Sequence, residues 1–317
     1  MNPDTYDVVV IGGGPAGLQA ALTLGRVHRS VLLLDSGEYR NAAAKEMHNF
    51  VTHDGRSPEE FRAAARRDLQ AYDTVEVRDL RAAEVADDGG LWRVTLDDAG
   101  SVEAAPDVTA RRVVLATGLR DTLPAIPGLS DLWGDVVAHC PFCHGHELSG
   151  RHVGILGSGP HVARVALLLE RIAARITVYA DGEELDEATG VQLAQAGVDV
   201  RPEKVSGVCR SSKGATVALA NGADEEVAGL FVSPALAQAA PFAEQLSLEM
   251  LPSGCIRVDE LGRTSRQGIF AAGDLAHLAA LPMPLASVLN AASAGLLAAT
   301  AAEQDLLTEE HGQPAVA

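Results

Sequence analysis

A glycine-rich turn near the N-terminus constrains the fold more than any other feature of the sequence. A short β-branched run at 6–11 ends in the sequence G-G-G-P-A-G at 12–17, and an Ala/Leu-rich helical stretch follows to about Arg26. A second apolar run at 30–34 closes with Asp35. The order strand, glycine turn, helix and strand predicts one βαβ unit whose parallel strands are buried on both faces.

The spacing within this turn is that of a dinucleotide-binding motif. In G-x-G-x-x-G the glycines permit a tight turn and let backbone N–H groups approach a pyrophosphate at a helix N-terminus. Gly12, Gly14 and Gly17 fit this pattern, and Asp35 supplies the acid expected about 20 residues further on to hydrogen-bond a ribose hydroxyl. We therefore predict a dinucleotide site here; the alternative is a glycine-rich turn without a ligand.

The middle of the chain repeats this order of strand, glycine turn, helix and strand, with a less regular glycine turn. A strand at 153–156, the turn G-S-G-P at 157–160, a helix to about Ala173 and a strand at 176–179 predict a second βαβ unit. Val162 stands where close packing of helix against strand prefers glycine or alanine. Two nucleotide-binding folds are therefore expected, with an uncertain ligand for the second.

The segment after the second unit's last strand is unfavourable for NADPH. The sequence at 179–184 offers Asp181, Glu183 and Glu184 where a 2′-phosphate needs arginine or lysine. NADPH should bind poorly there, if at all. Because Asp181 could instead hold an NAD ribose, the site is either a weak nicotinamide site or a vestigial scaffold.

The remaining segments indicate that the second unit is inserted into the first. Further strands are predicted at 93–96, 113–115 and 230–234, and a linker at 119–128. The expected fold class is α/β, with two Rossmann-like nucleotide-binding domains, the first at 1–118 and 248–317 and the second at 119–247. A length of 317 residues suits two domains. The polar tail from about Gln304 is expected to be frayed.

Charge and hydropathy exclude several classes of partner. A formal net charge of −18 would repel phosphate backbones, so nucleic acid and anionic membranes are poor candidates. The sequence holds no apolar run of the roughly 18 residues that a membrane span requires. The N-terminus lacks the basic and long apolar regions of a secretion signal. We therefore expect a cytoplasmic protein.

Two of the four cysteines are close in sequence, in a C-x-x-C at Cys140 and Cys143. Such a pair can be redox-active, half of a zinc site or a coincidence. Zinc needs two more ligands, and the histidines at 139, 144 and 146 all crowd the same short segment, so we expect no metal. The redox interpretation is favoured. Cys209 and Cys255 are expected to be ordinary thiols.

A base beside the cysteine pair would be useful, because the thiolate is the attacking species. His144, directly after Cys143, is the best-placed base; the alternative is a solvated or hydrogen-bonded turn histidine. His139 and His146 are less distinctive. A dinucleotide fold and a dithiol in one chain suggest a flavin, because an isoalloxazine can exchange electrons with sulfur.

With these motifs the whole chain resembles the low-molecular-weight thioredoxin reductases. The resemblance covers the turn at 12–17, Asn49, the segment 116–118, the C-x-x-C and Gly273-Asp274, followed by an Ala-rich terminal helix. It implies an FAD-dependent homodimer. It also implies FAD contacts from the residues Gly12, Gly14, Pro15, Ala16, Gly17, Asp35, Asn49, Thr117, Gly118, Gly273 and Asp274.

The resemblance also implies roles for the cysteines and for the terminal helix. Cys143 would face the flavin and Cys140 would exchange with substrate. The start of the helix near 286–289 would direct its positive dipole at the flavin and stabilise the reduced, anionic form.

The sequence departs from the reductases at three points. His144 replaces the acid that usually follows the second cysteine, and the basic residues for NADPH are missing from 179–184. Ala286 and Ser287 stand where the reductases tend to carry an Arg-Gln pair. The proton chemistry, the electron source and the flavin environment are therefore all expected to differ.

The sequence C-P-F-C-H-G at 140–145, with Met283-Pro284, looks more like a branch of this superfamily that includes the gliotoxin and holomycin dithiol oxidases. That resemblance implies oxidation of a small-molecule, secondary-metabolite dithiol through Cys140 and Cys143. Electrons would pass to FAD and then to O2, giving H2O2, without NAD(P)H. The alternatives are an NAD(P)H-dependent reductase of thioredoxin or another protein disulfide, and a non-catalytic redox-sensing flavoprotein.

Overall fold

The chain divides into two compact units, each described here by itself. The computed structural model describes residues 5–97 and 106–312. The first unit comprises 1–40, 59–120 and 236–317, and the second comprises 41–58 and 121–235. The chain passes from the first unit to the second at 120/121 and back at 235/236, where we expected 118/119 and 247/248. In addition, the segment 41–58 groups with the second unit.

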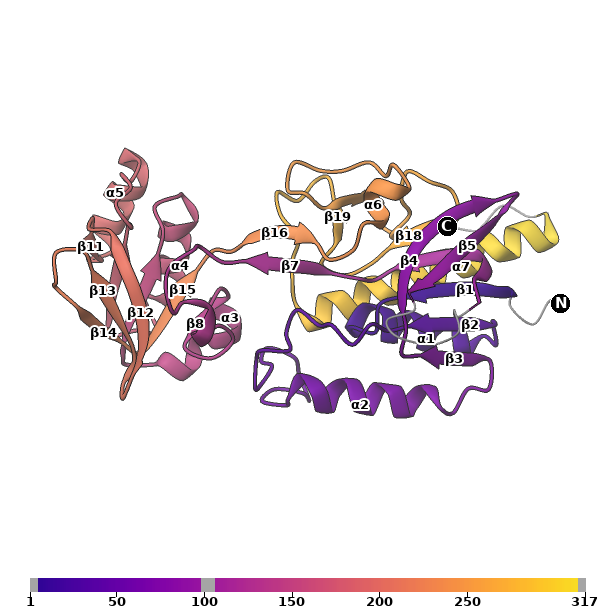
Figure 1. Cartoon of the computed structure of the whole chain (residues 1–317), viewed down its shortest axis with the longest axis horizontal. Coiled ribbons are helices and arrows are strands. Elements are labelled where there is room, and N and C mark those ends of the chain that lie inside the picture. The colour runs from indigo at the N-terminus through magenta and orange to yellow at the C-terminus, as the bar shows by residue number, and fades with distance from the viewer. Residues whose placement is uncertain (1–4, 98–105, 313–317) are drawn as a thin grey trace. The chain divides into compact units, whose positions relative to one another are not determined.

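The first unit is built on a seven-stranded mixed sheet with the order β3-β2-β1-β6-β5-β4 and β18 paired to β6 (Figure 1). Its strands are β1 (Thr5–Ile11), β2 (Val31–Leu34), β3 (Val75–Arg78), β4 (Arg81–Asp88), β5 (Leu91–Asp97), β6 (Val108–Leu115) and β18 (Ile269–Ala271). β4 and β5 form an antiparallel ribbon that joins the otherwise parallel sheet at β6. Strands β1 and β2 are buried along almost their whole length, as parallel strands covered on both faces require.

Four helices belong to this unit: α1 (Pro15–Arg26), α2 (Pro58–Leu69), α6 (Phe242–Gln245) and α7 (Val288–His311). Small residues let α1 and α7 pack closely, because a Cβ at Gly295 would overlap the carbonyl oxygen of Ala16. Ala298, Ala299 and neighbouring alanines of α7 are fully buried in the same core. A further pair of short strands, β17 (Ile256–Val258) and β19 (Ala276–Leu278), is parallel.

The expectation of a frayed tail from Gln304 is wrong for the residues that the structure describes. Helix α7 continues past this point, and Leu306 is fully buried. The last turns are also fixed by charge, since Arg112 donates to Asp305 with Nε and Oδ2 at 2.6 Å. The sequence is polar here because its carboxylates pair with arginines. Residues 313–317 lie outside the described part of the chain.

The strand register brings four chain segments to one edge of the first sheet. Ile11 of β1 is level with Leu34 of β2 and with Leu115 of β6, and Leu115 is level with Ala271 of β18. The segments that follow these four parallel strands therefore leave the sheet at the same edge. Ligands of open α/β sheets bind outside these carboxyl ends.

The second unit has a five-stranded parallel sheet with the order β11-β10-β9-β15-β8. Its strands are β8 (Val137–Ala138), β9 (His152–Leu156), β10 (Arg175–Tyr179), β11 (Asp199–Arg201) and β15 (Gly229–Val232). An antiparallel meander is formed by β12 (Val205–Ser211), β13 (Gly214–Leu219) and β14 (Glu225–Val227). The helices are α3 (Pro141–His144), α4 (His161–Leu169) and α5 (Glu187–Gln195), with 3-10 turns η1 (Ser130–Leu132) and η2 (His146–Leu148).

The carboxyl edge of this second sheet carries both of the motifs predicted for it. Phe231 of β15 is level with Ala138 of β8 and with Ile155 of β9. The C-x-x-C follows β8 and the second glycine turn follows β9, so both motifs leave the same edge. Helix α4 ends at Leu169, four residues before the expected end, and two backbone N–H groups in the following turn donate to the Leu169 carbonyl.

The segment expected to be a linker begins with a strand. β7 (Leu119–Thr122) pairs with β16 (Ala235–Gln238), so both main crossings between the units lie in one two-stranded ribbon (Figure 1). Among the described residues, no helix is both long and apolar enough to cross a membrane.

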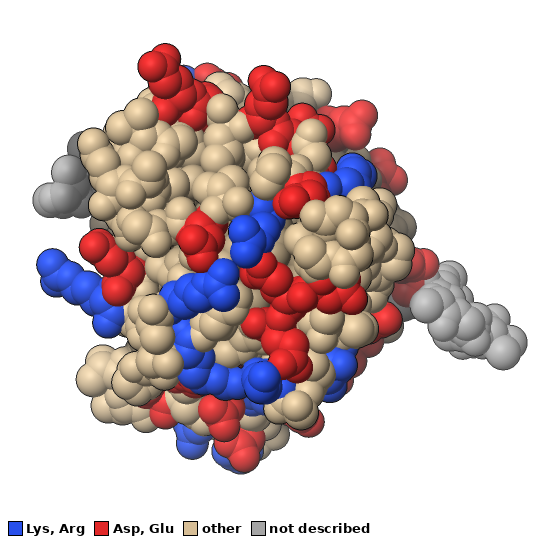
Figure 2. Space-filling view, turned by 90° about the vertical axis from the view of Figure 1, so that its left-hand side faces the viewer, with Lys and Arg blue, Asp and Glu red and all other residues tan. Residues whose placement is uncertain are grey.

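Basic side chains of the second unit lie next to carboxylates. Lys213 pairs with Glu226 at 2.6 Å, and Arg201 pairs with Glu225 at 2.6 Å. Figure 2 shows an arc of Lys and Arg side chains bordered by Asp and Glu side chains on the face that it presents. The positive charge on this face is therefore balanced locally.

Candidate active site

The first glycine turn is shaped by close backbone contacts. Gly12 has a φ of +117°, and a Cβ there would overlap the carbonyl oxygen of Ala116. A Cβ at Gly17 would overlap the carbonyl oxygen of Gly12, so helix α1 can approach strand β1 this closely only with glycine. A Cβ at Gly14, by contrast, would meet no atom of the described chain within 4 Å. The turn is therefore closed on the protein side and open on the side of Gly14.

This open side fits the pyrophosphate of FAD. Gly14 is the N-cap of α1 and makes no side-chain cap, and Pro15 stands at the first helical position. The remaining N–H groups of the first turn are donors that a phosphate can accept from. Ala16 is 4% exposed and packs against Gly273, where a Cβ would lie 3.0 Å from the Ala16 Cβ. The residues present fit the dinucleotide that the sequence predicts.

Two more of the predicted segments lie at the same sheet edge. Thr117 and Gly118 follow β6, and Gly118 has a φ of +72°. Gly273, with a φ of +86°, and Asp274 follow β18. The Asp274 carboxylate accepts a hydrogen bond from Arg40 with Nη1 and Oδ2 at 2.8 Å. This arginine was not singled out from the sequence, because nothing in its local pattern marks it.

The acid after β2 is buried and already paired within the chain. Asp35 is 2% exposed and accepts from Tyr39 Oη at 2.6 Å and from Arg66 Nη2 at 2.5 Å. Burial, together with the hydrogen bond to Asp35, raises the pKa of Tyr39 to about 12. The Asp35 carboxylate also fills the space beside Gly13, where a Cβ would overlap it. The backbone N–H of Gly37 donates to Asp35 Oδ1 at 3.0 Å, so the expected ribose contact would use a carboxylate that is already held in place by three donors.

Asn49 belongs to a different unit from the other predicted cofactor residues. It belongs to the segment 41–58 of the second unit and has a left-handed backbone, with a φ of +62°. Its backbone N–H donates to Asp54 with N and Oδ1 at 2.7 Å. The structure thus brings together the predicted cofactor residues of the first sheet edge, and Asn49 is carried by the other unit.

The cysteine pair forms a disulfide at the start of helix α3. Cys140 is the N-cap residue, Pro141 is at the first helical position, and the two cysteine Cα atoms are 5.3 Å apart. The Cys140 carbonyl oxygen accepts from the N–H groups of Cys143 and His144, both at 3.1 Å. Both cysteines are half-buried, and Phe142 between them is 60% exposed. This local geometry places two sulfurs of one short turn within reach of a small molecule.

His144 has the environment of a neutral imidazole. Its Nδ1 is buried and has no hydrogen-bond partner among the described residues. Burial lowers the pKa of His144 below its ordinary value, opposed by the negative charge of Glu147. His139 instead stacks on Trp133, with ring centroids 5.6 Å apart, and His146 is exposed. His144 directly follows Cys143, and its ring, which is neutral near pH 7, can accept a proton.

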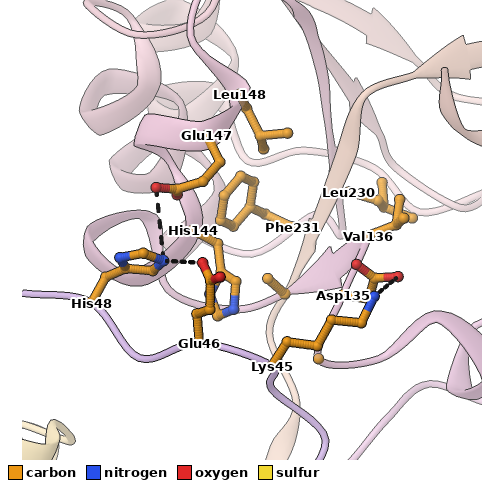
Figure 3. A pocket seen from close by; sticks show the side chains of 12 residues that line it. Lys45, Glu46, His48, Asp135, Val136, His144, Glu147, Leu148, Leu230 and Phe231 are labelled. Atoms are coloured by element: carbon orange, nitrogen blue, oxygen red, sulfur yellow. Dashed lines mark ion pairs between the residues drawn. The ribbon is translucent and has the colours of Figure 1, made fainter. Parts of the chain in front are cut away.

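A cavity of about 250 Å³ lies beside His144 in the second unit (Figure 3). Its polar lining comes from Lys45, Glu46, His48, Asp135, His144 and Glu147, and its apolar lining from Val136, Ala138, Leu148, Leu230 and Phe231, with Gly134. Figure 3 shows His48, Glu46 and Glu147 grouped at one side of His144. Sequence reasoning missed this cavity because its walls come from four separate segments.

Carboxylates surround the second imidazole of this cavity. His48 Nε2 lies 3.6 Å from Glu46 Oε2 and 3.8 Å from Glu147 Oε1, and His48 Nδ1 lies 3.6 Å from Asp54 Oδ1. At the other side of the cavity, Lys45 Nζ lies 3.7 Å from Asp135 Oδ2. The only signal in the sequence was that His48 directly precedes Asn49.

The second glycine turn is partly covered by a side chain. Gly157 has a φ of +133°, and a Cβ there would lie 3.3 Å from Nε2 of His161. A Cβ at Gly159 would lie 3.1 Å from Nδ1 of the same ring. Val162 is fully buried at the position that glycine occupies in the first turn. An imidazole therefore lies over the turn where a pyrophosphate would approach.

The acid after β10 is also engaged within the chain. Asp181 has a left-handed backbone, and its Oδ1 accepts from the backbone N–H of Val205 at 2.9 Å. Lys204 Nζ lies 3.5 Å from its Oδ2. The acidic turn expected from the sequence therefore has a lysine beside it, and this lysine is paired with the acid rather than presented alone.

The two remaining cysteines are separate from each other. Cys209 is exposed on β12, whereas Cys255 is fully buried, and burial raises the pKa of its thiol. Within 5–97 and 106–312, no three His, Cys, Asp or Glu residues are grouped so as to hold a metal ion.

The start of the last helix is confirmed near its expected position. α7 begins at Val288, and Ser287 caps it by accepting from the backbone N–H of Asn290 at 3.1 Å. The serine that replaces one residue of the reductases' usual pair is thus a helix cap.

The chain matches known proteins over nearly its full length. Residues 6–303 match the pyridine nucleotide-disulphide oxidoreductase family. Thioredoxin reductase tcpT of Claviceps purpurea (strain 20.1) is 34% identical over 334 residues, covering 98% of this chain and 97% of that protein.

Solved structures show the same fold. The oxidoreductase from Agrobacterium tumefaciens superposes with a TM-score of 0.86 at 36% identity, covering 96% of this chain and 99% of that one. HlmI superposes with a TM-score of 0.86 at 33% identity, covering 98% and 96%. The chain therefore belongs to the pyridine nucleotide-disulphide oxidoreductase family, in which its two Rossmann-type units follow the thioredoxin reductase-like fold.

Proposed function

We propose that the protein is an FAD-dependent dithiol oxidase. It converts a small-molecule dithiol of a secondary metabolite into an intramolecular disulfide, with O2 as the electron acceptor and H2O2 as the product. The first unit holds FAD through the turn at 12–17 and the segments after β2, β6 and β18. The second unit carries the redox pair Cys140 and Cys143.

The observation that carries this proposal is the state of the second glycine turn. His161 covers the turn, Val162 replaces the glycine of closest approach, and Asp181 is engaged by Val205 and Lys204. A reductase needs NAD(P)H at this place, whereas an oxidase does not. The covered turn beside an intact first turn therefore favours electron entry through the disulfide.

The thiol chemistry uses groups that the second unit supplies. A substrate thiolate attacks Sγ of Cys140, the Cys140–Cys143 bond breaks, and Cys143 leaves as a thiolate. The second substrate thiolate then attacks the substrate sulfur of the mixed disulfide, which releases the cyclic disulfide and the Cys140 thiolate. His144 accepts a thiol proton, because its burial keeps it neutral near pH 7.

When bound, FAD supplies the two-electron acceptor for the reduced cysteine pair and passes the electrons to O2. The overall balance is one dithiol and one O2 giving one disulfide and one H2O2. Two electrons and two protons leave the substrate.

The test is anaerobic reduction of the bound flavin, followed by its absorbance. We expect dithiothreitol to bleach the flavin and NADPH to bleach it much more slowly, with admission of air restoring the colour and producing H2O2. Rapid bleaching by NADPH and none by the dithiol would refute the oxidase.

The second candidate is an NAD(P)H-dependent reductase of thioredoxin or another protein disulfide. It is favoured by the name of the relative from Claviceps purpurea, which is a thioredoxin reductase. This enzyme would require motion between the two units during turnover. A redox-sensing flavoprotein, the third alternative, predicts negligible steady turnover with either electron donor.

Two further proposals concern the state of the protein in the cell. We propose a homodimer, which light scattering would contradict by giving the mass of one chain. We also propose that it acts in the cytoplasm, which fractionation of the source cells tests directly.

A further inference from the structure

We propose that His48 is a second proton acceptor for the cysteine pair. It takes over the proton that His144 removes from the first substrate thiol, so that His144 is free to serve the second. This inference rests on the thiol chemistry of the proposed function, which requires two thiols to be deprotonated in each turnover.

The carboxylates around His48 are more exposed than the His48 ring itself. His144 has a buried, unpaired Nδ1, and the His48 side chain is 18% exposed on the same cavity (Figure 3). The three carboxylates around His48 are exposed further, at 45% for Glu147, 61% for Glu46 and 67% for Asp54. A proton on His48 therefore lies next to three carboxylates that are more exposed to the solvent than the ring.

The cavity has room for the water that such a transfer needs. Its volume of about 250 Å³ exceeds several times the roughly 30 Å³ that one water takes up in the liquid. The lining combines apolar side chains, Leu148, Leu230 and Phe231, with imidazoles and carboxylates. Water held there would have hydrogen-bond partners in His48, His144 and the neighbouring carboxylates.

The loop that carries His48 is closed on itself. The backbone N–H of Met47 donates to the carbonyl of Arg56 at 2.8 Å. Asp54 accepts from the N–H of Asn49 at 2.7 Å and lies 3.6 Å from His48 Nδ1. One carboxylate therefore fixes the turn and faces the imidazole, which leaves Nε2 of His48 directed to the side of Glu46 and Glu147.

Two protons leave the dithiol in each turnover, and a second imidazole gives the first proton a place to go before the second is removed. The dithiol gives up one proton before each sulfur attack, and the two cysteine thiolates are released one after the other. His144 can hold one proton, and burial lowers its pKa, so it tends to pass that proton on. The charged groups that act on His144 are Glu147, His48 and Asp135, and those facing His48 are Glu46, Asp54 and Glu147.

The test is cleavage of the Cys140–Cys143 disulfide by dithiothreitol in the complete holoenzyme. Rapid alkylation after mixing, followed by mass spectrometry, counts free thiols and the mixed disulfide on Cys140 between about pH 5.5 and about pH 8.5, a range that spans the ordinary histidine pKa. In His48→Gln we expect the second step to slow by about tenfold, because a proton acceptor is lost. The mixed disulfide should accumulate in this variant and not in the wild type.

Two companion variants separate proton transfer from a structural role. His146→Gln is the matched control, since His146 is in the same segment and does not line the cavity; it should behave as the wild type. In His48→Ala, added imidazole should restore the second step. Equal rates and equal pH profiles in wild type and His48→Gln would overturn the inference, as would a slow His48→Ala that imidazole fails to restore.

Failure of the proposed function would look different. Disulfide cleavage is counted on the cysteines and does not depend on where the electrons go next. A His48-dependent second step in a protein whose flavin responds to NADPH and not to the dithiol would refute the oxidase and support the role of His48.

Discussion

The two glycine turns have the same place in their units and opposite surroundings. In the first unit, the turn at 12–17 is closed by backbone contacts and open at Gly14. In the second unit, Val162 fills the position of Gly17, and the ring of His161 lies over both glycines. Both turns follow a central strand with parallel neighbours, β1 in the first unit and β9 in the second, so the difference comes from two side chains and not from the fold.

The acids after the next strand of each unit, Asp35 after β2 and Asp181 after β10, also differ in their surroundings. Asp35 is 2% exposed and held by Tyr39 and Arg66, whereas the Asp181 side chain is 24% exposed and caps one backbone N–H. The comparison teaches that one fold can keep a ligand site in one copy and use the same positions for internal contacts in the other. The second unit's carboxyl edge carries the Cys140–Cys143 disulfide, which follows its outer strand, β8.

The largest expected effect is the loss of flavin from the first turn. In Gly17→Ala, the new Cβ overlaps the Gly12 carbonyl oxygen, so α1 must move away from β1, which costs about 3 kcal/mol in unfolding free energy. Flavin content per chain, measured by absorbance after gel filtration, should fall to near zero.

The matched variants distinguish shape from ligand contact. Gly14→Ala meets no protein atom, so the melting temperature of the flavin-free protein should be that of the wild type while flavin affinity falls by about tenfold, or about 1.4 kcal/mol. Val162→Ala in the second turn should leave flavin content unchanged. Full flavin content in Gly17→Ala would mean that the two turns are not as different as their contacts indicate.

The next effect concerns the base at the edge of the second sheet. His144→Gln should slow cleavage of the disulfide by dithiothreitol by about 100-fold near neutral pH, because the thiol loses its proton acceptor. In the wild type, the rate should fall as the pH falls through the His144 pKa, since only the neutral ring accepts a proton. Because burial lowers that pKa, this decrease should lie below pH 6.5. A rate that does not depend on His144 would remove it from the chemistry.

A smaller effect on stability is expected from replacing the two acids, Asp35 and Asp181. Asp35→Asn weakens the buried contacts with Tyr39 and Arg66 and should cost about 2 kcal/mol of stability, as expected for hydrogen bonds to a charged group. Asp181→Asn keeps an acceptor for Val205 and should cost less than about 1 kcal/mol. Urea unfolding followed by circular dichroism measures both, and the reverse order would contradict the comparison.

The smallest effect is expected at the covered turn. His161→Ala removes the ring from above Gly157 and Gly159, so anaerobic flavin reduction by NADH should rise by about threefold, or less than about 1 kcal/mol in the barrier. The rate with dithiothreitol should not change. An unchanged rate with NADH would show that the ring is not what keeps the dinucleotide away.

Sequence reasoning found the buried parallel strands and, in its prediction at 93–96, part of the antiparallel strand β5. β1, β2, β9 and β10 are apolar runs that end at glycine turns or acids, so both their type and their ends are visible in the sequence. The meander β12–β14 and the strand β4 were not predicted. β12 and β14 are half-exposed, and β4 carries a bulge and several acids, so no simple alternation marks these three strands. β13 does alternate, with Ala215, Val217 and Leu219 buried, but its run is short and bounded by small residues.

The end of α7 shows why polarity alone misleads. Its last turns are rich in acids, which indicated a frayed tail, yet Arg29, Arg111 and Arg112 bind these acids from residues far away in the sequence. The partners of a charged side chain are not visible in its own segment.

In the candidate site, too, local patterns were visible in the sequence and contacts between distant segments were not. The glycine turns, the C-x-x-C and the position of His144 are local patterns and were found. The cavity with His48, Glu46 and Asp135 depends on a closed loop packing beside β8, which requires the tertiary structure.

The ribbon of β7 and β16 has a consequence for protein engineering. The N–H of Ala239 donates to the carbonyl of Gly118 at 3.2 Å, so the chain leaves and re-enters the first unit at neighbouring points. A short bridge between these two residues would delete the central segment while leaving the strands β1, β2, β6 and β18 continuous. Because the segment 41–58 belongs to the same unit as the central segment, an exchange of the central segment must replace 41–58 as well.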